Sequence, residues 1–118
     1  MRDVIIQEVD KCRYATAGDY FIKDGITYIQ VKRQLNDDYT FLISIHELIE
    51  QYLTERKGIK EEDILKFDLA HDYCEEPGAH PDSIYKNEHE IAEIIERILA
   101  KFMGVDWNKY EQEIQISE

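Results

Sequence analysis

The 118-residue sequence is poor in the residues that cross-link or interrupt a chain, with two cysteines, two prolines and five glycines. Two cysteines, Cys12 and Cys74, are too few for a disulfide framework, so we expect reduced thiols. No repeat, low-complexity tract or glycine-rich linker divides the sequence. We therefore predict a single domain over residues 1–118.

Long apolar runs are also missing. No run approaches the roughly 18 residues that a membrane span needs, and the segment from Met1 to Val4 lacks the apolar core of a secretory signal. We expect a cytoplasmic protein that does not associate with membranes. Because 43% of the residues are hydrophobic, the chain has enough apolar material for a core, which argues against disorder.

Positive charge is scarce, since 14 Lys and Arg residues face 26 Asp and Glu residues and the net charge is −12. Residues 60–118 carry ten of the twelve excess negative charges. A field of this sign repels phosphate groups, so we predict no direct binding of nucleic acid. The favoured partners are cations and the basic surface of another protein. The oligomeric state cannot be read from the sequence.

The N-terminal third predicts a β-hairpin. Residues 19–23 and 26–31 flank Asp24-Gly25, a pair typical of a two-residue hairpin turn. Residues 4–6 are a candidate third strand, and we expect an antiparallel sheet of two or three strands.

Helices follow, from about Tyr39 to Gly58, from Glu61 to about Asp68, from about Ile84 to Met103, and a short one after Asp106. Asn36-Asp37-Asp38 offers caps for the start of the first, Gly58 and Gly104 end the first and third, and Asp106 is a cap for the last. The pattern predicts an α+β fold in which the sheet packs against the two long helices. Their expected buried faces are Phe41, Leu42, Ile45, Leu48, Ile49, Tyr52 and Leu53 in the first, and Ile91, Ile94, Ile95, Ile98, Leu99 and Phe102 in the second.

The first long helix contains the motif H-E-x-x-E at residues 46–50. His46 and Glu50 are four residues apart and share one face, so both could reach one divalent cation, and Glu47 could approach a water from the side as a general base. Zinc accepts a carboxylate in place of an imidazole, so we predict a divalent metal, most simply Zn²⁺. In the alternative interpretation His46 borders the core and both glutamates are solvated.

The same pattern recurs at His89–Glu93 on the second long helix. If the two helices pack side by side, His46, Glu50, His89 and Glu93 would converge as ligands. Alternatively, the stripe containing His89, Glu93 and Glu96 is a solvated face.

The polar stretch of residues 68–83 adds acidic groups and two more histidines to this region. Asp68, His71 and Glu93 are further candidates, either as additional ligands or as residues that orient a histidine. Pro77-Gly78 and Pro81 are typical of turns. The alternative is an ordinary exposed acidic loop.

Short segments that together span nearly the whole chain carry a resemblance: Gly18-Asp19-Tyr20, His46–Glu50, Phe67-Asp68, Glu76-Pro77-Gly78, Tyr85, Glu88-His89, Ala92, Glu96-Arg97, Gly104–Trp107 and Tyr110. In that order they are similar to segments of a group of small, uncharacterised bacteriophage and prophage proteins. The motif helix resembles that of zincin-like metallopeptidases, whose signature ends in His where this chain has Glu50. The resemblance implies metal ligands at His46, Glu50 and His89 and a catalytic base at Glu47, hence a minimal metal-dependent, peptidase-like hydrolase with a zincin-like fold.

Two other functions remain open. His71-Asp72, with His46 and Asp82, resembles the pattern of HD-type metal-dependent phosphohydrolases, and the paired E-x-x-E segments at 47–50 and 93–96 resemble that of all-α nucleotide pyrophosphohydrolases. The non-enzymatic alternative is an acidic binding protein that mimics DNA or binds a host factor.

Overall fold

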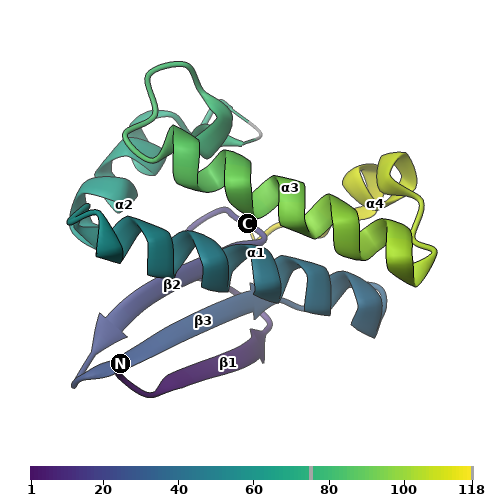
Figure 1. Cartoon of the computed structure of the whole chain (residues 1–118), viewed down its shortest axis with the longest axis horizontal. Helices are drawn as coiled ribbons and strands as arrows, with labels where there is room; N and C mark the ends of the chain where they lie inside the picture. Colours follow the sequence, from purple (N-terminus) through teal and green to yellow (C-terminus); the bar gives the residue numbers. More distant parts are fainter. Residues whose placement is uncertain (75, 118) are drawn as a thin grey trace.

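Three N-terminal strands form a mixed sheet in the order β1-β3-β2 (Figure 1). The computed structural model describes residues 1–74 and 76–117. Strands β2 (Gly18–Lys23) and β3 (Ile26–Lys32) are antiparallel and are joined by Asp24 and Gly25. Both turn residues have positive φ angles, 51° and 75°, as a tight two-residue turn requires.

Strand β1 (Val4–Val9) pairs in parallel with β3, so the prediction of an antiparallel sheet is wrong for this strand. Residues 10–17 cross the end of the central strand before β2 begins. The two outer strands therefore run in opposite directions with β3 between them. This arrangement depends on pairing across the sheet, which strand propensity does not encode.

Four α-helices and one short 3₁₀ helix follow in the described part of the chain, so the α+β class is confirmed. Asn36 caps the first helix, because its side chain accepts a hydrogen bond from the Tyr39 backbone N–H at 2.9 Å. Gly104, whose backbone is in the left-handed region, ends the third α-helix. The helices are α1 (Asp37–Arg56), α2 (Glu61–Ala70), η1 (Pro77–Ala79), α3 (Lys86–Met103) and α4 (Trp107–Glu113).

Helix α1 lies between the sheet and α3 and contacts both (Figure 1). α3 runs antiparallel to α1, and α4 packs near the C-terminal part of α3. None of the described helices is long and apolar enough to cross a membrane.

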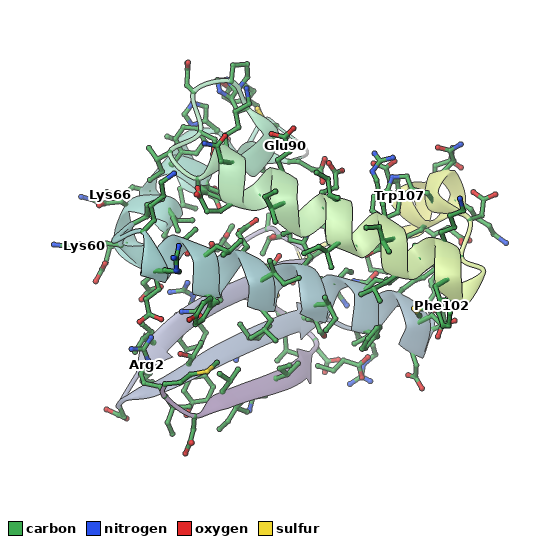
Figure 2. The ribbon with its side chains drawn as sticks, in the orientation of Figure 1. Arg2, Lys60, Lys66, Glu90, Phe102 and Trp107 are labelled. Atoms are coloured by element: carbon green, nitrogen blue, oxygen red, sulfur yellow. The ribbon has the colours of Figure 1, made fainter. Side chains whose placement is uncertain are left out.

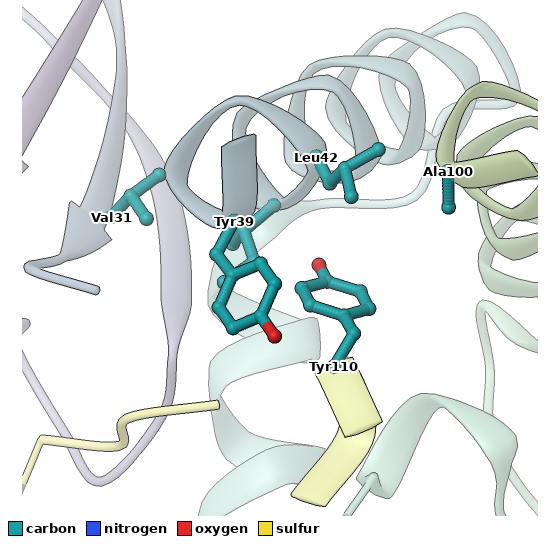
Figure 3. Packing of buried hydrophobic residues seen from close by; sticks show 6 residues of the cluster. Val31, Tyr39, Leu42, Ala100 and Tyr110 are labelled. Atoms are coloured by element: carbon teal, nitrogen blue, oxygen red, sulfur yellow. The ribbon is translucent and has the colours of Figure 1, made fainter. Parts of the chain in front are cut away.

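The apolar core has two parts. One, shown in Figure 3, joins β3, α1, α3 and α4 through Val31, Tyr39, Leu42, Ile43, Ala100 and Tyr110. The other joins β2, β3, α2 and the residue preceding α3 through Tyr20, Ile29, Ile64 and Tyr85.

The predicted core stripe of α3 is largely wrong, because Ile91, Ile94, Ile98 and Phe102 are exposed. The buried residues of this helix are instead Glu88, His89, Ala92, Glu96 and Ala100. The expected buried face of α1 is wrong in part, since Phe41 and Tyr52 are exposed while Leu42 is fully buried. A helical period reveals that two faces differ, but which face is covered depends on the neighbouring elements.

Candidate metal centre

Three candidate ligand atoms from α1 and α3 meet in a small buried triangle. His46 Nε2 lies 3.1 Å from Glu50 Oε2 and 3.3 Å from His89 Nδ1, and the Glu50 and His89 atoms are 2.9 Å apart. Tetrahedral zinc with bonds of about 2.0–2.1 Å holds its ligand atoms about 3.3 Å apart. The two nitrogens and the oxygen therefore have the spacing and chemistry of one face of a zinc shell.

The second ring nitrogen of His46 is held by a carboxylate. His46 Nδ1 lies 2.7 Å from Glu96 Oε1, and the Tyr110 hydroxyl donates to Glu96 Oε2 at 2.5 Å. Burial lowers the pKa of His46, but hydrogen bonds to Glu50 and Glu96 raise it, and the net pKa lies well above its usual value, so the metal-free ring favours a proton on both nitrogens. A metal bound at Nε2 would displace the proton there, and the proton on Nδ1 would remain on the hydrogen bond to Glu96, which is the tautomer that a metal ligand needs.

Glu50 is a buried carboxylate in the ionised form. Burial raises its pKa, but hydrogen bonds and charge interactions with His46 and His89 outweigh burial and bring the pKa to about 2. Its second oxygen, Oε1, accepts a hydrogen bond from the Tyr20 hydroxyl at 2.9 Å. The interpretation in which Glu50 is solvated is therefore wrong, and Oε2 remains directed at the two histidines.

His89 is enclosed by the segment that contains η1. A Cβ atom added to Gly78 would lie 2.6 Å from His89 Nδ1 and 2.7 Å from a ring carbon of Tyr85. Gly78 is therefore a wall of the site as well as a turn residue. His89 Nε2 is buried and has no hydrogen-bond partner in the described part of the chain, and Glu76 Oε1 lies 3.9 Å from it.

Glu47, the candidate catalytic base, lies on the sheet side of α1. A Cβ atom added to Gly18 at the start of β2 would come within 2.6 Å of Glu47 Oε1, so the carboxyl group packs on the strand backbone. Burial raises its pKa, and the nearby charges of Glu50, Asp19 and Asp68 raise it further against the opposing effect of His46. The carboxyl group can thus hold a proton nearer neutral pH than an ordinary glutamate.

The additional candidate ligands lie away from the triangle. Both oxygens of Asp68 accept tyrosine hydroxyls, from Tyr85 at 2.5 Å and Tyr14 at 2.7 Å. The His71 ring stacks on Phe67 with ring centroids 3.9 Å apart.

Glu93 also lies apart from the three ligand atoms. It approaches Glu76 and Glu111, with oxygens within 4.8 Å of one another, and its Oε1 lies 3.7 Å from Arg97 Nη2. The expected convergence of Glu93 on the two-helix site is wrong, because α3 turns Glu96 toward α1 instead.

Sequence reasoning missed the tyrosines that surround the site. Their rings belong to the core, while their hydroxyls donate to buried carboxylates. Tyr20 donates to Glu50, Tyr85 to Asp68 and Tyr110 to Glu96. The available signal was composition, since eight tyrosines are many for 118 residues. A buried tyrosine usually finds a polar partner, and these partners are the site carboxylates and Asp68.

No protein-family model matches this chain, and no curated protein or solved structure matches it.

Proposed function

We propose that the chain binds one divalent metal ion, most simply zinc, through His46, Glu50 and His89, and that it acts as a minimal zincin-like metal-dependent hydrolase. The observation that carries this proposal is the buried triangle of two imidazole nitrogens and one carboxylate oxygen, 2.9–3.3 Å apart. The His46–Glu96–Tyr110 chain supports it, because a carboxylate behind a histidine is the usual means of orienting a metal ligand.

A bound divalent cation supplies Lewis acidity to a carbonyl group and makes water more acidic. Glu50 contributes the negative charge of the ligand set, and Glu96 holds the proton on His46 Nδ1. Glu47, the residue after His46 on α1, would accept the proton of the attacking water at its carboxylate and return it to the leaving group. If His46, Glu50 and His89 held the metal, a fourth position would be free for water, as in catalytic zinc sites.

A groove of about 550 Å³ lies beside this region, and none of the three proposed ligands lines it. It is bordered by β2, the end of α1 and the start of α2, and Tyr20 is one of its walls. Tyr20 separates the groove from the ligand set, because its hydroxyl contacts Glu50.

The decisive experiment is elemental analysis of untagged protein purified without chelators, with metal counted per chain. We expect about one zinc per wild-type chain and none in His46→Ala or His89→Ala. His80→Ala is the matched control, because His80 lies outside the triangle and should keep its chain fully loaded. Absence of metal in the wild type, even after incubation with zinc, manganese or magnesium, would overturn the proposal and favour an acidic binding protein.

A Glu47→Gln variant separates binding from chemistry. It should retain the metal and lose hydrolysis of peptide or ester substrates by about 10²- to 10⁴-fold, since only the proton acceptor is removed. Loss of metal in this variant would contradict the role assigned to Glu47.

A further inference from the structure

An apolar surface covers the outer side of the two long helices. Its most exposed members are Phe102, with 90% of its surface accessible, and Ile98, with 63%. Phe102 extends from the C-terminal end of α3 away from α4 (Figure 2). We call the following set the outer apolar face: Phe41 and Tyr52 from α1, and Ile91, Ile94, Ile98 and Phe102 from α3.

The residues of this face lie on one common side of the helix pair. Tyr110 packs against Tyr39 of α1 and donates its hydroxyl to Glu96 of α3, so it marks the inner side of both helices. At 100° per residue, Phe41 and Tyr52 lie nearly opposite Tyr39, and Ile94 and Ile98 lie nearly opposite Glu96. Since α1 and α3 are packed neighbours, the two apolar rows adjoin.

The size of the face suits a protein interface. The six side chains leave on the order of 600 Å² of apolar surface exposed, which is at the upper end for a patch on a monomer. One partner contributes about 600–1,000 Å² to a stable interface of standard size. Removing this apolar surface from water by contact with a partner would therefore lower the free energy.

Charge and helix direction favour a second copy of the chain as the occupant. The solvent-exposed charges of the two helices are mixed, although the chain carries −12 overall: Lys86, Glu90, Arg97 and Lys101 on α3, and Asp37, Asp38, Glu55 and Arg56 on α1. Two such faces meet without a concentrated charge of one sign. Because α1 and α3 are antiparallel, a twofold axis that brings two faces together places each helix antiparallel to its neighbours, as in a four-helix bundle.

We propose that the outer apolar face pairs with the same face of a second copy to form a twofold dimer. The inference does not depend on the metal site. The same contact predicts that salt strengthens the dimer. Salt screens the long-range repulsion between two chains that each carry a net charge of −12, and it does not weaken the apolar contact.

Sedimentation velocity on the full chain, over a concentration series at low and high salt, tests the proposal. The wild type should sediment as a dimer whose dissociation constant falls as salt rises. Ile94→Lys should raise that constant at least about tenfold, since a lysine would be buried without a partner. The matched control is Ile6→Lys on β1, because Ile6 and Ile94 are both 48% exposed.

Phe102→Lys serves as a second variant, because a side chain that is 90% exposed contributes little to the core of one chain and its loss should not prevent folding. Circular dichroism should show unchanged helix content in all three variants. A wild type that stays monomeric at the highest concentration overturns the proposal. So does a dimer that both helix variants retain, or one that Ile6→Lys disrupts equally, which would indicate the sheet edge as the contact.

Discussion

At the scale of single residues, Glu96 decides how His46 can act. Its two oxygens accept from two different partners, His46 Nδ1 and the Tyr110 hydroxyl, so the buried carboxylate has both oxygens satisfied. A buried carboxylate without such partners would be strongly destabilising. The arrangement fixes the ring orientation of His46 and the position of its proton together.

Replacement of Glu96 by glutamine tests this role. Glu96→Gln keeps the size of the side chain but removes the charge that favours a proton on Nδ1, so we expect zinc affinity to fall by about 10- to 100-fold. A competition titration with a chromogenic chelator measures the affinity. Glu93→Gln, on the same helix but turned away from the triangle, is the control and should bind as the wild type does. Equal affinities for all three proteins would contradict the role of Glu96.

At the scale of elements, the site depends on how closely η1 approaches α3. Gly78 of η1 is buried against the His89 and Tyr85 rings, and there is no room for a side chain there. Helix α3 in turn approaches α1 along small residues, with Ala92 and Ala100 almost fully buried. Small residues at these contacts allow the histidine and glutamate side chains to fill the space between the elements.

A Gly78→Ala substitution would disturb His89 directly. Because the added methyl group would lie 2.6 Å from Nδ1, the ring must move, and we expect zinc affinity to fall at least about tenfold, with about 1–3 kcal/mol lost from the free energy of unfolding. Gly58→Ala separates the two effects. Gly58 has a φ of +81° with open space around it, so alanine there should cost stability without changing metal affinity.

At the scale of the whole molecule, Asp68 connects three segments that are distant in sequence. Its carboxylate on α2 accepts hydroxyls from Tyr14 in the β1–β2 connection and from Tyr85 just before α3. Burial raises the pKa of Asp68, although the two tyrosine hydrogen bonds oppose that rise. The folded chain therefore binds a proton at Asp68 more tightly than the unfolded chain does.

This difference gives a pH-dependent contribution to stability with a defined sign. A raised pKa in the folded state stabilises the fold below the unfolded pKa of about 3.9, and the contribution is lost as the pH rises through the folded value. Asp68→Asn removes the titration. Urea unfolding of metal-depleted protein should therefore show the stability of the wild type relative to Asp68→Asn decreasing from acid pH toward neutrality. A difference that grows with pH would contradict the assignment.

The local sequence determined the elements of this protein. Asp24-Gly25 predicts the turn, Asn36 and Asp106 predict helix starts, and Gly104 predicts a helix end, because each depends on the backbone preferences of a few adjacent residues. The spacing of His46 and Glu50 likewise places two polar atoms on one face of a helix whatever surrounds it. These features need no knowledge of distant residues.

Only the tertiary structure decided what those elements face. It made β1 parallel to β3, turned Ile98 and Phe102 outward, and brought Glu96 rather than Glu93 to His46. The physical reason is that each outcome depends on contacts between segments far apart in sequence. The amphipathic period of α3 is equally strong whichever face is buried. The face that is buried is the one on which His89 and Glu96 find polar partners on α1 and α4.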